Sequence, residues 1–121
     1  MPTKTQHVQK AEGNETFAKS IDTTSQARID WKLVILFYAA VHYVEAYLAM
    51  SSGTHLRSHT TRDNYISKES NLKKIRVSYA HLKYYGYNAR YEFDGFTAKD
   101  VREASGYLSQ VKAELVPLLN A

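Results

Sequence analysis

The chain has 121 residues, of which 44% are hydrophobic and 23% are charged, and its formal net charge at pH 7 is +4. This length and apolar content suffice for one domain with a buried core, but the chain is too short for two domains that each bury a core of their own. We therefore expect residues 1–121 to form a single domain. The absence of cysteine excludes thiolate catalysis, disulfide bonds and cysteine-ligated zinc.

The amino-terminal decapeptide MPTKTQHVQK is polar and lacks the apolar core of a secretory signal. It therefore predicts a cytoplasmic protein. After it, apolar residues recur at helical spacing and predict a weak first helix, interrupted at Gly13. These residues are Val8, Ala11, Ala18 and Ile21.

Residues 24–51 are apolar nearly all round, which predicts a long helix in the middle of a helical bundle. Thr23 and Gln26 have the spacing of a capping box at its start, and Gly53 follows its end. The stretch WKLVILFYAAVHYVEAYLAM is about as long as a bilayer span, at roughly 20 residues. Because it carries His42 and Glu45 near its middle, and a carboxylate in a bilayer core is costly, we expect no membrane insertion.

Three further helices are predicted downstream. Ser58 can cap a short helix over residues 59–68, and a stripe of Leu72, Ile75, Tyr79 and Leu82 predicts a helix over residues 69–86. Thr97 and Asp100 begin the last helix, which Pro117 should fray at its end. Its apolar stripe consists of Val101, Ala104, Leu108, Val111, Leu115 and Leu118.

No segment alternates with period two for long enough to predict a strand, so the expected fold is all-α. The short connections between the predicted helices favour an up-and-down bundle of four to five helices.

The positive charge is concentrated in one part of the chain. Residues 55–92 hold eight Lys and Arg against three Asp and Glu, whereas residues 1–54 are balanced and residues 93–121 sum to −1. Residues 55–91 also hold three of the five histidines and six of the ten tyrosines. A cationic surface with aromatic rings suits RNA or nucleotide phosphate, and an ordinary solvated helix face has the same composition.

His59 and Arg62 are the first catalytic candidates. Three residues apart at a helix start, they place an imidazole beside a guanidinium where backbone N–H groups also favour an anion. Such a pair can act as general base and charge stabiliser, although exposed side chains beside a loop are the better interpretation of the sequence alone. His55 and His59 have the i, i+4 spacing of metal ligands, but no third ligand is evident, so we expect no metal and no cofactor.

His42 and Glu45 share a face of the long helix with Tyr38. Buried polar groups must be paired, so we expect this group to meet either a basic residue from the 55–91 window or a partner chain. A core hydrogen-bond network is the simpler interpretation, and a supporting role behind an active site is the alternative.

Arg76 and His81 form a second catalytic candidate, an Arg followed by a His after four residues. In the middle of a regular helix the two side chains would diverge, so they converge only at a helix start or across a two-fold interface. Further candidates for phosphate binding are His55, Arg57, Lys73, Lys74 and Arg90. The tyrosines from Tyr84 to Tyr91 could stack on bases, and an interface or core position is favoured for most of them.

The order of a first helix, the long DWKLVILFYAAVHYVEAYLA helix, the segment HLRSHTTRDNYI, a helix ending YYGYNARY and an amphipathic last helix resembles the HEPN superfamily. These are small helical domains named for higher eukaryotes and prokaryotes nucleotide-binding. The resemblance implies a bundle that dimerises through its long helices. It also implies a signature R-x4-6-H, contributed by both subunits to one cleft, which Arg76 and His81 match in spacing. Val77 departs from the polar residue that commonly follows the arginine.

What the resemblance implies for function is a homodimer that binds RNA or nucleotide. One form is a metal-independent endoribonuclease of a toxin–antitoxin or defence system, with His59 or His81 as the base and Arg62 or Arg76 as the charge stabiliser. The alternative is a non-catalytic interaction module that pairs with a second protein, such as a nucleotidyltransferase or an antitoxin.

Overall fold

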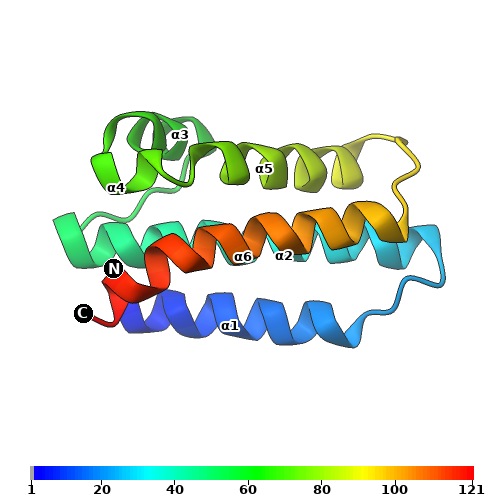
Figure 1. Cartoon of the computed structure of the whole chain (residues 1–121), viewed down its shortest axis with the longest axis horizontal. Helices are drawn as coiled ribbons and strands as arrows, with labels where there is room; N and C mark the ends of the chain where they lie inside the picture. Colours follow the sequence, from blue (N-terminus) through cyan, green and yellow to red (C-terminus); the bar gives the residue numbers. More distant parts are fainter. Residues whose placement is uncertain (1) are drawn as a thin grey trace.

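The computed structural model describes residues 2–121, and in this range it contains six helices and no strand. The helices are α1 (Lys4–Ser20), α2 (Gln26–Ser52), α3 (His59–Lys68), α4 (Ser70–Lys73), α5 (Arg76–Tyr91) and α6 (Ala98–Leu119). The all-α prediction is therefore confirmed. The four long helices run alternately up and down, and the short α3 and α4 lie beyond the start of α5 at one end of the bundle (Figure 1).

Helix α2 is the central element of the bundle. It packs against α1, α5 and α6, and fourteen of its 27 residues are buried. By length and composition α2 could cross a membrane, but 72% of its most apolar window is buried inside the protein. Because its apolar side chains are covered by the other helices, α2 has the burial pattern of a core helix.

The start of α2 differs from the predicted capping box. Ser25, not Thr23, is the N-cap, and its hydroxyl accepts from the Arg28 backbone N–H. The Asp22 carboxylate accepts both the N–H and the hydroxyl of Thr24, which holds this segment in a turn and delays the helix. The predicted end is confirmed, since Gly53 has a left-handed φ of 63° and closes the helix.

Helix α1 is continuous, so the interruption predicted at Gly13 is wrong. Thr3 and Gln6 form a complete capping box that fixes its start. A Cβ at Gly13 would meet nothing within 4 Å, which shows that this glycine faces open space on the outer side of the helix. Glycine there weakens the helix by about 1 kcal/mol without breaking it.

The single helix predicted over residues 69–86 is divided into α4 and α5. Glu69 ends α3 and caps α4, and Ile75 has a φ of −104° and a ψ of 5°, outside the helical range. All four residues of the predicted stripe are nevertheless buried. The bend lets both short segments turn the same apolar stripe toward the core, and it accounts for a sixth helix where four to five were expected.

Helix α6 starts at the predicted capping box of Thr97 and Asp100. It continues past Pro117 to Leu119, so the predicted fraying at Pro117 is wrong. Leu119 is buried and its carbonyl accepts from the Lys4 Nζ at 2.8 Å. This contact joins the end of α6 to the start of α1 and holds the last turn of α6 in place.

We expect Gly86→Ala to destabilise the protein although alanine is the better helix former. A Cβ at Gly86 would lie 2.7 Å from the Phe37 Cβ, so α5 and α2 would have to separate, at a net cost of about 1–2 kcal/mol. Urea unfolding measures this change. Gly106→Ala on α6, where a Cβ meets nothing within 4 Å, should instead add up to about 1 kcal/mol. Equal effects of the two substitutions would contradict the close packing.

Candidate functional site

A buried ion pair lies at the centre of the polar groups inside this protein. Glu45 on α2 and Arg62 on α3 are only 1% and 4% exposed, and the Arg62 Nε donates to Glu45 Oε1 at 2.9 Å. The other carboxylate oxygen, Oε2, accepts from the Leu56 backbone N–H at 3.0 Å. Charges buried this deeply must be paired, and the expectation that Glu45 meets a basic residue of the 55–91 window is confirmed.

The other two nitrogens of the Arg62 guanidinium also form hydrogen bonds. Its Nη2 donates to the Leu56 carbonyl at 2.8 Å, and its Nη1 lies 3.0 Å from His59 Nδ1. Because a guanidinium only donates, His59 Nδ1 is the acceptor of this bond. Arg62 therefore fixes both the backbone before α3 and the ring of His59 at its first position.

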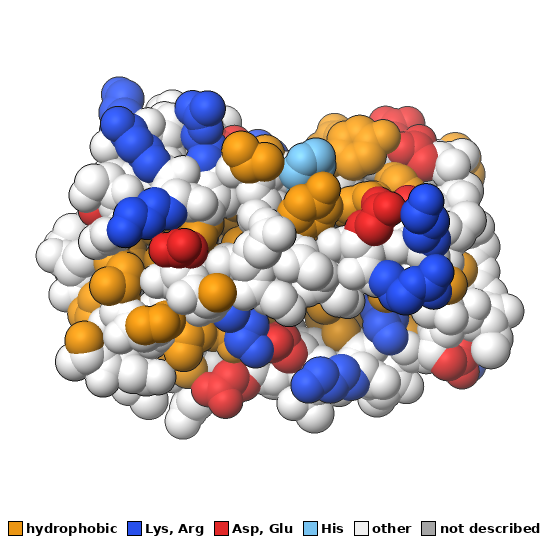
Figure 2. Space-filling model, in the orientation of Figure 1, with side chains coloured by type: hydrophobic (Ala, Val, Ile, Leu, Met, Phe, Trp, Pro, Cys, Tyr) orange, Lys and Arg blue, Asp and Glu red, His pale blue; other side chains and the backbone are white. Residues whose placement is uncertain are grey.

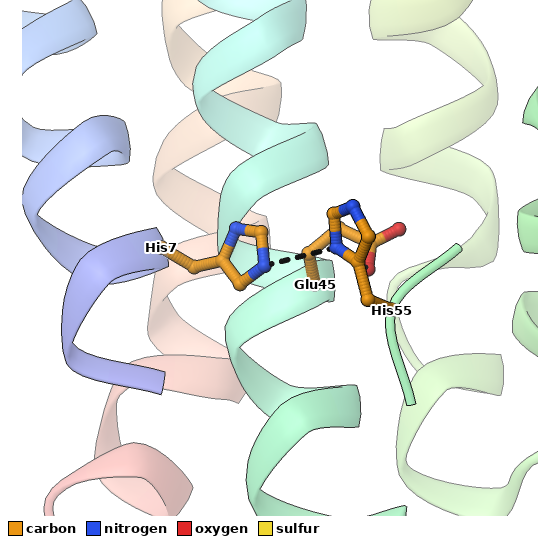
Figure 3. A group of neighbouring side chains, drawn as sticks. All are labelled: His7, Glu45 and His55. Atoms are coloured by element: carbon orange, nitrogen blue, oxygen red, sulfur yellow. Dashed lines mark hydrogen bonds and ion pairs between the residues drawn. The ribbon is translucent and has the colours of Figure 1, made fainter. Parts of the chain in front are cut away.

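His7 on α1 lies between two other histidines. Its Nδ1 is 3.1 Å from His42 Nδ1, and its Nε2 is 3.3 Å from His55 Nδ1. The His7 ring is tilted by 32° to that of His42, with centroids 5.3 Å apart, and it stacks on that of His55, with centroids 5.2 Å apart and planes 21° from parallel. His55 Nδ1 is also 3.6 Å from Glu45 Oε2, which joins the histidines to the ion pair (Figure 3).

The protonation of the three linked histidines determines which nitrogen donates in each contact. Burial lowers the pKa of His42 to about 4 and also lowers the pKa of His7, so both rings are neutral at neutral pH. A neutral imidazole has one donor and one acceptor nitrogen. Both contacts are satisfied when the Nδ1–H of His55 donates to His7 Nε2 and the Nδ1–H of His7 donates to His42 Nδ1.

The structure brings His59 and Arg62 together as predicted, at a helix start where Ser58 accepts from the Thr61 N–H. However, Arg62 is buried and its donors are used inside the protein. His59 is half-buried beside the rings of Phe37 and Tyr38, and burial, followed by the charge of Arg62, lowers its pKa. The geometry of this pair suits structural support better than contact with a phosphate.

The sequence predicts that Arg76 and His81 lie in the middle of a helix, but in the structure they lie near a helix start. Because α4 ends before Ile75, Arg76 is the first residue of α5, and both candidates are exposed. They line one surface hollow together with Val77, Ala80 and Tyr84. The His81 ring stacks on Tyr107 with centroids 4.4 Å apart and planes 8° from parallel, which fixes its orientation at the edge of the hollow.

The candidates for phosphate binding divide between the interior and distant parts of the surface. His55 belongs to the buried network, and it does not share a helix with His59, because α3 begins only at His59. Arg57, Lys73, Lys74 and Arg90 are exposed. Lys73 and Lys74 adjoin Arg76, but Arg90 lies fourteen residues further along α5, a distance of about 21 Å.

Sequence reasoning missed His7. It lies one helical turn before Ala11, on the same buried side of α1 as Ala11 and Ala18, so extending that stripe backwards would have placed it inside the bundle. The two supporting residues, His42 and Glu45, are both part of the network that His7 completes. The bonds between α1, α2 and the segment before α3 depend on tertiary structure, which no spacing in the sequence reveals.

No protein-family model, curated protein or solved structure matches this chain.

Breaking the Glu45–Arg62 pair should be costly. We expect Arg62→Met to lower the free energy of unfolding by about 3–5 kcal/mol, because it leaves a buried carboxylate without its counter-charge. The double variant Glu45→Met, Arg62→Met should lose less than the sum of the two single variants. Lys83→Met, which breaks the more exposed pair with Asp63, should cost at most about 1 kcal/mol. Urea unfolding of the four variants tests this, and equal losses in Arg62→Met and Lys83→Met would refute it.

Acid should destabilise the protein through its buried histidines. Since the pKa of His42 is about 4 in the fold against 6.5 in the unfolded chain, the unfolded chain binds the extra proton between these values. Stability is therefore complete above pH 6.5 and falls toward pH 4, by about 1 kcal/mol at pH 5 once the partial exposure of the ring is allowed for. His42→Gln should reduce the difference in urea midpoint between pH 7 and pH 5. The same substitution at the exposed His81 should not, and identical pH dependence of both variants would contradict this origin.

Proposed function

We propose that this protein is a HEPN-like homodimer that binds RNA or nucleotide phosphate and acts as a metal-independent endoribonuclease, in a cytoplasmic toxin–antitoxin or defence role. The observation that carries the proposal is the position of Arg76 and His81. Both are exposed at the start of α5 and line the same hollow, and their spacing is the R-x4-6-H of that superfamily.

These two side chains supply the chemistry that RNA cleavage needs. In the proposed reaction the His81 imidazole removes the proton of a ribose 2′-hydroxyl, which attacks the adjacent phosphorus and expels the 5′-oxygen of the next nucleotide. The Arg76 guanidinium stabilises the negative charge that develops on the phosphoryl oxygens. A second His81 from the partner copy can protonate the leaving oxygen, so the reaction needs no metal ion.

The surface around Arg76 supports binding of a single strand. On the side of α5 that faces α3, Arg76 also lines a second hollow with Tyr84 and Tyr87. The two tyrosines are 55% and 56% exposed, and such rings stack on bases of any sequence. Lys73 and Lys74 are exposed just before α5, and Arg57 is exposed just before α3, so all three can contact phosphates. Figure 2 shows Lys and Arg side chains over this end of the molecule.

The dimer is supported by an unpaired helix face. Large exposed side chains follow one another along α5 at intervals of seven, three and four residues, which marks one stripe that the other described residues leave uncovered. They are Val77, Tyr84, Tyr87 and Tyr91. Tyrosine is enriched at protein interfaces, and pairing of two such stripes at their Val77 ends would place two copies of Arg76 and His81 close together.

The alternative, a non-catalytic module that binds a second protein, is favoured by one feature of the same stripe. Val77 is 64% exposed directly beside Arg76, so an apolar side chain stands at the position where the superfamily commonly has a polar one. An exposed apolar contact next to the candidate site suits a protein partner.

We expect the purified protein to cleave single-stranded RNA in the presence of EDTA. His81→Ala and Arg76→Ala should each lower the rate by about 100-fold or more, because each removes one of the two proposed catalytic groups. Arg102→Ala, which removes an exposed arginine on α6, is the matched control and should keep the rate. Circular dichroism of each variant checks that the fold persists.

Val77→Glu should convert the dimer to a monomer in analytical ultracentrifugation and abolish cleavage. RNA binding should weaken as salt is raised, since it rests on phosphate neutralisation. A chain that is monomeric as wild type, or cleavage that is insensitive to both His81→Ala and Arg76→Ala, would overturn the proposal. Absence of cleavage together with co-purification of a second protein through the α5 stripe would favour the non-catalytic alternative.

A further inference from the structure

We propose that His7, His55 and Glu45 form a binding site for a divalent transition-metal ion of the zinc class. The site is built from three elements, since His7 comes from α1, Glu45 from α2 and His55 from the segment between α2 and α3 (Figure 3). One ligand atom of each residue lies within 4.8 Å of the others. This inference does not depend on the proposed ribonuclease activity, whose residues lie on α5.

The distances fit coordination of one ion. Ligands at about 2.0–2.1 Å from a tetrahedral zinc are roughly 3.3–3.4 Å from one another. His7 Nε2 and His55 Nδ1 are 3.3 Å apart, and His55 Nδ1 is 3.6 Å from Glu45 Oε2. Two of the three edges of the required triangle are therefore already close to the length that coordination demands.

The surrounding hydrogen bonds hold two of the three ligand atoms, His7 Nε2 and Glu45 Oε2, in the form that binds a metal. Coordination through His7 Nε2 requires the proton on Nδ1, and His42 Nδ1 lies 3.1 Å away as its acceptor. Metal-bound histidines characteristically donate their other N–H in this way. Glu45 Oε2 is oriented by the Leu56 N–H at 3.0 Å and keeps a further lone pair. Coordination through His55 Nδ1 would move the single proton of that ring to its Nε2, so the imidazole would stay neutral.

The donor set and its surroundings define the class of ion. Two imidazoles and one carboxylate suit zinc, cobalt or nickel, whereas magnesium and calcium prefer oxygen ligands throughout. The His55 side chain is 22% exposed, so water can reach the site and complete the coordination. Arg62 on the other Glu45 oxygen opposes a second positive charge nearby, so we expect micromolar affinity and not the tighter binding of a closed structural site.

A bound ion would tie α1 to α2 and to the segment that leads into α3. That segment already depends on Leu56, whose carbonyl and N–H both bond to the ion pair. Metal binding would therefore stabilise the end of the bundle from which α3 starts. This effect on stability requires no change at Arg76 or His81.

Isothermal titration of the EDTA-treated, dialysed full chain with zinc chloride tests the site. We expect one ion per chain, and a rise in Tm of about 10 °C at a hundredfold excess of zinc over its Kd. Cobalt should give the visible absorption of a tetrahedral nitrogen–oxygen site. Magnesium at the same concentration should leave the Tm unchanged.

Variants separate this site from adventitious binding. His55→Gln, at a partly exposed position, and His7→Gln should each abolish stoichiometric binding, whereas His42→Gln, which exchanges the supporting imidazole acceptor for a misplaced amide, should weaken it about 10–100-fold. His81→Gln is the matched control and should bind as the wild type does. Should either ligand variant fold poorly without metal by circular dichroism, the cobalt spectrum of wild type against His81→Gln and His42→Gln still decides the question. No binding to the wild type, or equal binding to wild type and His55→Gln, would overturn the inference.

Discussion

The structure depends on neutralising one carboxylate inside a helical core. Glu45 lies in the most buried helix of the bundle, where an unpaired charge would be prohibitively costly. A cation and further donors brought to the carboxylate offset this cost. Arg62 provides the cation and the Leu56 N–H a further donor, so this requirement fixes the path of the chain from the end of α2 into α3. His59 is oriented by the same guanidinium.

This requirement separates the polar residues of the protein into two groups. Four of the five histidines, His7, His42, His55 and His59, are connected to Glu45 and Arg62 inside the bundle. The fifth, His81, is exposed on α5 beside Arg76. The internal group has its hydrogen bonds within the chain and is suited to holding elements together. The external group has free donors and neighbouring aromatic rings, and it is suited to a ligand that arrives from solvent.

Local signals predicted local structure well. Ser58, Gly53 and the Thr97–Asp100 pair mark helix ends in the sequence, and each does so in the structure, because capping involves residues only a few positions apart. One local prediction, the capping box at Thr23, failed because Asp22 holds Thr24 in a turn. The other predictions failed where distant contacts decide the outcome. Gly13 and Pro117 do not interrupt their helices, since buried neighbours such as Ala11 and Leu119 hold those helices against the core. The bend at Ile75 likewise allows the apolar side chains of α4 and α5 to be buried against the core.

The sequence by itself determined the helical class, most of the apolar stripes and the fact that Glu45 needs a partner, either a basic residue of the 55–91 window or another chain, because periodicity and desolvation act on residue types alone. Only the tertiary structure decided which partner that is, and that the exposed pair is Arg76 with His81 and not His59 with Arg62. It also brought His7 to His55 across 48 positions of the chain. The physical reason is that a side chain's availability depends on what other helices place beside it, and no short-range pattern encodes that arrangement.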